Sequence, residues 1–186
     1  MKKKTEVLPI FDDLHHLIEQ KEGPEWVNAG DYRIARDFLL SYRGSVDTFN
    51  AYRREVERLM QWCTWVQQKT FSELTRADLE VFIDFSRQPF LEWIGTEQVS
   101  RFFDKNGLRL ANPPWRPFLV KVSKAEHKEG LIPDRSRYQF SVSALHALFR
   151  ILSTFFSFLE MEDYVLSNPI KKIRQKSQYL MKSQGK

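Results

Sequence analysis

The chain has 186 residues, of which 42% are hydrophobic and 14% aromatic, enough to bury the core of one domain, or of one domain with an arm. Its single cysteine, Cys63, excludes an internal disulfide framework and a cysteine zinc site. The formal net charge is +5, and residues 101–186 hold 16 basic against 7 acidic side chains, which favours either a polyanionic partner or a solvated lysine-rich end.

The first half of the chain predicts helices after an irregular start. Residues 1–30 read as an N-terminal arm, interrupted at Gly23 and Pro24, with at most a short helix. A helix is predicted over Asp31–Tyr42. The clearest helix covers Ser45–Gln68, where apolar residues recur at 3.6 spacing and mixed charges, typical of a solvated face, lie opposite.

The second half combines two more helices with an irregular middle. Thr75 and Asp78 have the spacing of a capping box and predict a helix that runs to Arg87. A short helix is expected over Trp93–Asp104, whereas the prolines that follow exclude helix around residues 112–117. Tyr138–Glu160 is the second strong helix, and the fold class is mainly α. The large aromatics of the middle should anchor it to a core, namely Trp93, Trp115 and Phe118.

No catalytic or metal-binding constellation is visible. His15 and His16 are adjacent, so on a helix they point about 100° apart and cannot chelate together. His127 and His146 have no ligand neighbours in sequence, and no glycine-rich phosphate loop occurs. We expect no catalytic residue, no metal and no cofactor.

The chain also lacks the sequence signals of export. Lys2–Lys4 is not followed by an apolar run, so no signal peptide is predicted. The most apolar stretch, Ala144–Leu159, looks too short to span a bilayer and contains His146 and Arg150. We expect a cytoplasmic protein without a membrane partner.

One face of the last helix is small and polar, with no acidic residue before its end. Such a face can approach a phosphate backbone or lie in a major groove, where arginine and histidine donate hydrogen bonds. A helix buried on both sides would show the same small residues, and the pattern leaves both interpretations open. The face consists of Ser143, His146, Ala147, Arg150, Thr154 and Ser157.

Three segments, taken in order, resemble the N-terminal core-binding domain of tyrosine site-specific recombinases, the phage-type integrases. Thr48–Trp62 resembles the first core-binding helix of that family, and Leu74–Phe82 resembles the second. Ala144–Leu159, followed by Tyr164-x-x-x-Asn168-Pro169, is similar to the last core-binding helix and to the Asn-Pro that opens the interdomain linker.

The resemblance implies a fold and a division of the chain. The fold would be a helical bundle of the integrase core-binding (SAM-like) type with an enlarged, partly irregular middle segment. Residues 1–30 would form an arm, residues 31–169 the core-binding domain with an insertion-like segment at 88–137, and residues 170–186 a basic linker toward a catalytic domain that this sequence lacks.

The family's function supplies further expectations. Its two domains clamp DNA from opposite sides, and its catalytic arginines, lysine, histidines and tyrosine all lie in the second domain. We therefore expect no enzymatic activity of this chain, but DNA binding in the integration and recombination of a bacterial mobile genetic element. The expected partners are double-stranded DNA, which would associate the protein with the nucleoid, and other protomers of the same recombinase in a synaptic complex.

The residues expected to contact DNA come from several parts of the chain. The two core helices would provide groove and backbone contacts, and cations of the middle segment and the tail would bind phosphates. The set is Thr48, Arg53, Arg54, Arg135, Arg137, Ser143, His146, Arg150, Lys171, Lys172 and Arg174. The alternative is a helical protein–protein interaction module with a basic surface, anchored by exposed Trp62, Trp65 and Trp115.

Overall fold

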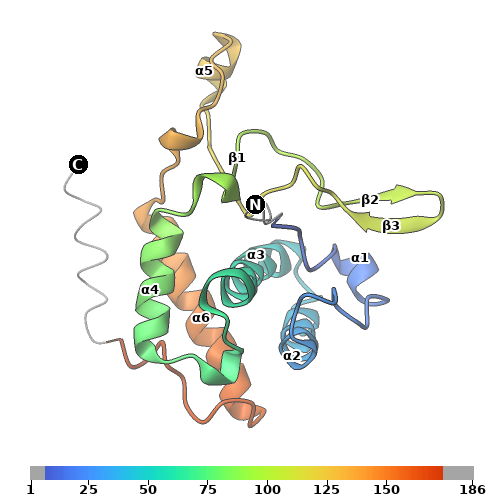
Figure 1. Ribbon diagram of the computed structural model, residues 1–186, viewed down its shortest axis with the longest axis vertical. Coiled ribbons are helices and arrows are strands. Elements are labelled where there is room, and N and C mark those ends of the chain that lie inside the picture. The colour runs from blue at the N-terminus through green and yellow to red at the C-terminus, as the bar shows by residue number, and fades with distance from the viewer. Residues whose placement is uncertain (1–6, 174–186) are drawn as a thin grey trace, which may run out of the picture. The chain divides into compact units, whose positions relative to one another are not determined.

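The computed structural model describes residues 7–173 and is mainly helical, as the sequence predicted (Figure 1). Its described residues divide into two compact units. The helical unit contains residues 10–84 and 141–173, and the middle unit contains residues 7–9 and 85–140. These boundaries lie beside the predicted insertion-like segment at 88–137, whereas residues 10–30 belong to the helical unit.

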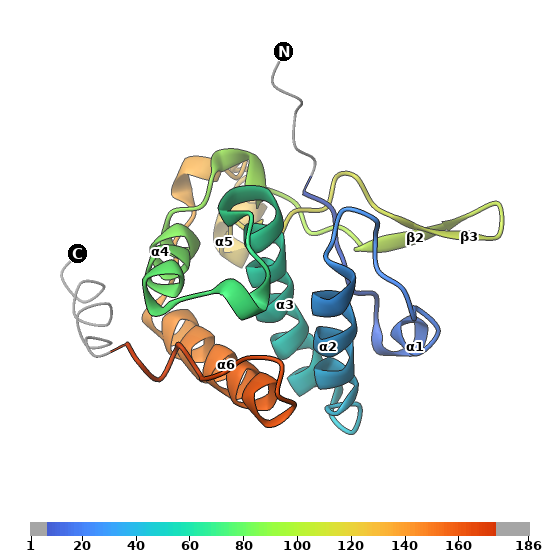
Figure 2. The ribbon, with the colours of Figure 1, turned by 60° about the horizontal axis from the view of Figure 1, so that its bottom comes forward.

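The helical unit is built from three long helices that pack on one another. Figure 2 shows α2, α3 and α6 in contact around one core. The ring of Phe38 on α2 lies 5.7 Å from that of Tyr52 on α3 and 5.0 Å from that of Phe155 on α6. The elements of this unit are α1 (Leu14–Leu17), α2 (Ala29–Leu40), α3 (Val46–Trp62), η1 (Cys63–Gln67), η2 (Phe71–Glu73), α4 (Arg76–Arg87, in this unit up to Asp84) and α6 (Val142–Met161).

Local hydrogen bonds and backbone conformation determine both ends of helix α3. Ser45 caps its first turn, accepting a hydrogen bond from the backbone N–H of Thr48 at 3.4 Å. The last turn widens into the π-helical η1, where the Thr64 hydroxyl bonds the Met60 carbonyl at 2.9 Å. Gln68 ends the element in the left-handed region, with φ of 55°.

The charged face of α3 is solvated only in part, contrary to the sequence interpretation. Glu57 and Gln61 are both buried, at 1% and 0% exposure. The Glu57 carboxylate accepts hydrogen bonds from the backbone N–H groups of Ile10 at 2.8 Å and Phe11 at 2.9 Å. Residues 10–13 therefore cover this face, and the predicted arm is in part a component of the helical core.

The predicted capping box at the start of α4 is confirmed. The Thr75 hydroxyl accepts from the Asp78 backbone N–H at 3.2 Å, and the Asp78 carboxylate accepts from the Thr75 N–H at 2.8 Å. Burial alone would raise the pKa of Asp78. The bonds from Thr75, together with Lys69 at 2.9 Å, outweigh burial and lower that pKa.

The middle unit contains short strands rather than the helix expected over Trp93–Asp104. A 3₁₀ turn, Leu91–Trp93, leads into a strand, and a second strand pairs with its neighbour in an antiparallel hairpin. The hairpin turns at Asn106 and Gly107, with φ of 51° and 75°. The elements are β1 (Ile94–Gly95) parallel to β4 (Phe118–Leu119), β2 (Phe102–Lys105) paired with β3 (Leu108–Ala111), α5 (Lys124–Lys128) and the 3₁₀ turn Arg135–Arg137.

Large aromatics anchor the middle unit, as predicted. Trp93, Trp115 and Phe118 are 2%, 8% and 0% exposed. The ring of Phe85 makes edge contacts with those of Trp93 at 5.1 Å and Phe118 at 6.2 Å. The Arg101 guanidinium lies 4.8 Å from the centre of the Trp115 ring. These contacts supply a small core of the unit's own.

Helix α6 has the length and composition of a membrane-spanning helix, the only such helix among residues 7–173. The prediction that this stretch is too short is wrong, because the helix extends to 20 residues. Its apolar residues are those of a core helix: the side chains buried in the fold are Leu145, Leu148, Phe149, Ile151, Leu152, Phe155, Phe156 and Leu159.

Candidate nucleic-acid interface

One side of α6 presents polar residues to solvent over its first half. Ser141 caps the helix and accepts from the Ala144 N–H at 3.1 Å. Ser143, His146 and Arg150 recur at intervals of three and four, so they share a face, and all three are exposed. We call these three residues the α6 stripe. No carboxylate lies on α6 before Glu160.

The second half of the same face is covered by the chain that follows the helix. The Asn168 side-chain amide donates to the Ser153 carbonyl at 2.9 Å and to the Ser157 hydroxyl at 3.1 Å. Ser153 and Ser157 stand three and seven positions after Arg150, on the same side of the helix. The first half of the small polar face is therefore open, and its second half is partly covered by protein. Its contact with DNA stays a prediction.

Asn168 also organises the turn that carries the first tail cations. Its side-chain oxygen accepts from the backbone N–H of Ile170 at 3.0 Å and of Lys171 at 3.4 Å. Ile170 and Ile173 are buried, at 0% and 4% exposure, while Lys171 and Lys172 between them are exposed. Residues 168–173, the 168–173 turn, therefore hold two lysines at a fixed place beyond the α6 stripe. Arg174 lies outside the described residues.

The predicted DNA-contacting residues of α3 differ in how far their side chains are hydrogen-bonded within the protein. Arg53 donates to the Asp12 carbonyl at 2.9 Å and to the Asn50 side chain at 3.1 Å. Arg54 is 47% exposed and pairs with the buried Glu55 at 3.0 Å. The Thr48 hydroxyl accepts from Ser45 at 3.0 Å. Arg53 therefore holds the N-terminal segment against α3, whereas about half of the Arg54 side chain is exposed to solvent.

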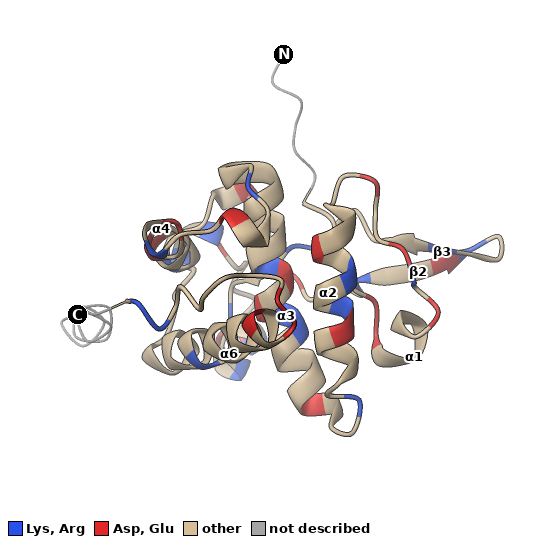
Figure 3. Cartoon of the chain, turned by 90° about the horizontal axis from the view of Figure 1, so that it is seen from below, with Lys and Arg blue, Asp and Glu red and all other residues tan. Residues whose placement is uncertain are grey.

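The structure places Thr48 of α3 and Ser143 of α6 far apart. Phe38 contacts Tyr52, one turn after Thr48, and its ring lies 5.3 Å from that of Phe158 near the end of α6. Ser143 stands at the other end of that helix, on the order of 20 Å away along its axis. Figure 3 shows basic and acidic residues interspersed on α2 and α3, so these helices present no single-sign surface.

Two further candidates belong to the middle unit. Arg137 is 52% exposed and forms an ion pair with Glu126 at 2.9 Å. Arg135 is exposed in the same 3₁₀ turn.

The anchors of the protein-interaction alternative are mostly inside the protein. Trp62 is 0% exposed and Trp115 is 8% exposed. Trp65 is 37% exposed, and its ring stacks on that of Trp26 at 5.3 Å. One of the three tryptophans is thus left at the surface to meet a partner.

A buried carboxylate fixes the segment that leads from α6 to Asn168. The Tyr164 hydroxyl donates to Asp31 at 2.6 Å, and the Phe71 backbone N–H donates to its other oxygen at 3.0 Å. Burial raises the pKa of Asp31, although these two hydrogen bonds act against it. Burial and the adjacent carboxylate also raise the pKa of Tyr164. This arrangement is structural and positions the 168–173 turn.

Among residues 7–173, one group brings metal-binding side chains together: Asp12, Asp13 and His16. Asp13 caps α1 through the His16 backbone N–H at 2.9 Å, and its carboxylate also contacts the His16 ring at 2.9 Å. Helix capping accounts for this geometry, and we assign no metal to it.

The residues missed by sequence reasoning are those that position the cations. Asn168 was recognised only as a marker of a linker, yet it forms the contact that joins the tail to α6. The buried isoleucines on either side of Lys171 and Lys172 were the available signal, because their spacing indicates a packed turn.

No protein-family model, curated protein or solved structure gives a match to this chain.

Proposed function

We propose that this chain is the DNA-binding, core-binding part of a tyrosine site-specific recombinase, and that it grips one side of a recombination site in DNA integration and recombination. Its helices would form the integrase-type bundle, and the cytoplasm would be its compartment. The observation that carries the proposal is the exposed α6 stripe, free of carboxylates, together with the two exposed lysines of the 168–173 turn, which Asn168 joins to the same helix.

The chemistry of this surface suits a duplex. Ser143, His146 and Arg150 are short or planar donors on one helix face, which is the arrangement that reads base edges in a major groove. Lys171 and Lys172 lie in the turn that Asn168 joins to α6, and they suit phosphate contacts, which fix register without reading sequence. The protein-interaction alternative has less support, since two of its three tryptophan anchors are buried.

The experiment is a binding selection from a pool of randomised duplexes, followed by fluorescence anisotropy on the selected and scrambled sequences. Arg150→Ala and His146→Ala should weaken binding and change the preferred sequence, because groove-facing donors discriminate bases by about 1–3 kcal/mol. Arg43→Ala is the matched control, since Arg43 is an exposed arginine of the same unit that belongs to neither α6 nor the 168–173 turn. Absence of wild-type binding at low salt, or equal effects of the Arg43 and Arg150 changes, would contradict the proposal.

A further inference from the structure

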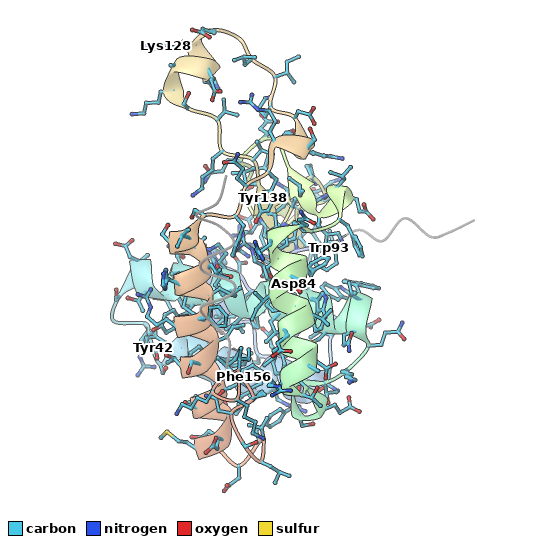
Figure 4. All side chains as sticks on the ribbon, turned by 90° about the vertical axis from the view of Figure 1, so that its left-hand side faces the viewer. Tyr42, Asp84, Trp93, Lys128, Tyr138 and Phe156 are labelled. Atoms are coloured by element: carbon cyan, nitrogen blue, oxygen red, sulfur yellow. The ribbon has the colours of Figure 1, made fainter. Side chains whose placement is uncertain are left out.

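The middle unit extends an arm, residues 121–137, from a packed base. At the base, the ring of Tyr138 makes an edge contact with that of Phe118 at 5.6 Å, and its hydroxyl donates to the Ser86 carbonyl at 3.3 Å. Figure 4 shows Lys128 at the outer end of this segment and Tyr138 at its base. None of the residues of α5, which lies in the arm, is buried.

Polar contacts within the arm give it a defined shape. Ser123 and Glu126 form a reciprocal capping box at the start of α5, with bonds of 3.2 Å and 3.0 Å. Glu126 also forms an ion pair with Arg137 across the arm at 2.9 Å, which joins the segment that leads to the tip to the segment that returns from it. Gly130, with φ of 73°, makes the turn between them. The arm is thus held by bonds that bury none of its apolar side chains.

Those apolar side chains sit together just past the turn. Ile132 is 87% exposed and Leu131 is 45% exposed, and Pro133 follows directly. An isoleucine left in water in this way contributes nothing to the core of its own unit. A narrow element that presents Leu-Ile-Pro at its end is the kind of wedge that enters the minor groove and separates two base pairs.

The charges around the wedge indicate what it meets. Lys121, Lys124, Lys128 and Arg135 are exposed in the arm. Two of the arm's three acids serve internal contacts: Glu126 holds Ser123 and Arg137, and Asp134 accepts from the Ser136 N–H at 2.9 Å. The third acid, Glu129, is exposed beside Lys128. With Arg137, the arm has five basic side chains against three acidic ones, and this positive excess suits phosphates on either side of a groove.

We propose that the 121–137 arm inserts Ile132, supported by Leu131 and Pro133, into the minor groove of duplex DNA and kinks the DNA there. This inference rests on the proposed function and adds a second contact of a different kind. The cations of the arm hold the flanking phosphates, while the wedge unstacks one base step. Flexible pyrimidine–purine steps such as TA would be preferred, because they kink most readily.

The test uses the full chain and a duplex of about 20–30 base pairs with dyes at both ends and 2-aminopurine at a central TA step. Energy transfer between the dyes reports the bend, and 2-aminopurine fluorescence reports unstacking. Ile132→Ala is the test variant, and Leu166→Ala is the matched control, a fully exposed leucine of the helical unit. Ile132 is so exposed that its truncation should leave the thermal midpoint unchanged.

Wild type and Leu166→Ala should bend the duplex and raise its 2-aminopurine signal. Ile132→Ala should abolish both signals and weaken binding by about tenfold or less. If Ile132→Ala binds and bends DNA like wild type, the arm proposal is wrong while the proposed function stands. If that variant instead loses self-association or a protein contact, the arm is a protein-docking surface. If wild type binds no duplex at low salt, the proposed function fails, and the arm proposal with it.

Discussion

The hydroxyl of Tyr164 donates a 2.6 Å hydrogen bond to the buried carboxylate of Asp31, 133 residues earlier in the chain. It ties the beginning of α2 to the segment that leads into the 168–173 turn. The placement of Lys171 and Lys172 therefore depends on a contact far from them in sequence.

Replacing Tyr164 by Phe should destabilise the protein by about 1.5–3 kcal/mol, because a buried charged acceptor loses its donor. Tyr32→Phe is the matched control, since its hydroxyl donates an equally short bond, 2.6 Å, to the neutral Gln20 carbonyl. Loss of this neutral hydrogen bond should lower the free energy of unfolding by about 0.5–1.5 kcal/mol. Urea denaturation measures both variants, and equal losses would show that the charge of Asp31 adds nothing to the bond.

The pH dependence of stability should carry a contribution from Asp31 of definite sign. Burial raises its folded pKa above the ordinary 3.8, so the folded state holds this proton at pH values where the unfolded state has lost it. This contribution to stability is fully present below pH 3.8 and is lost as the pH rises through the pKa of Asp31 in the folded state.

Denaturation of wild type and Asp31→Asn across this range gives a difference curve that isolates the group. The stability of wild type relative to the variant should fall as pH increases. Tyr164→Phe should extend the fall to higher pH, because the bond from Tyr164 acts to lower the pKa of Asp31. A difference curve that rises with pH would contradict the assignment.

Glu57→Ala should release the N-terminal segment from α3. The backbone N–H groups of Ile10 and Phe11 would lose their acceptor while they stay buried. Each unsatisfied group should lower the free energy of unfolding by about 1–3 kcal/mol. Hydrogen exchange at these two amides should accelerate. Glu57→Gln keeps an acceptor oxygen and should recover much of the protection, whereas exposed Glu160→Ala should change nothing. Protected amides in the Glu57→Ala protein would exclude this role.

The lysines of the 168–173 turn should act through salt-dependent, sequence-independent binding. Lys171→Ala with Lys172→Ala should flatten the plot of log affinity against log salt by roughly 0.9 per lost phosphate contact, equally for all duplexes. The control pair, Lys21→Ala with Arg43→Ala, removes two exposed cations elsewhere in the same unit. Anisotropy titrations over a range of salt measure the slopes, and a slope unchanged by the turn variant would remove these lysines from the interface.

We expect no strand cleavage by this chain alone. In the tyrosine recombinases that the chain resembles, the nucleophilic tyrosine and its arginine and histidine partners belong to a second domain. Incubation with nicked and suicide duplex substrates, followed by denaturing electrophoresis, checks this. A covalent tyrosine–DNA adduct in the purified chain would overturn the assignment.

Local pattern was sufficient for the main helices. The 3.6-residue spacing of Phe49, Val56 and Leu59 predicted α3, and the Thr75 and Asp78 pair predicted the start of α4, because these signals depend on neighbours within one or two turns. The β2–β3 hairpin was missed although Asn106-Gly107 is a strong turn signal. The surrounding aromatic residues were assigned to a helix instead.

The sequence by itself determined the long helices, where the charge accumulates and which side of α6 is polar. Only the tertiary structure decided that Glu57 and Gln61 are buried, that the second half of the polar α6 face is covered, and that Lys171 and Lys172 are held in a packed turn. The physical reason is that burial of a polar side chain depends on a partner that satisfies its hydrogen bonds. For the Glu57 carboxylate and the side-chain N–H group of Asn168, those partners lie 11 to 47 residues away, beyond the reach of any local pattern.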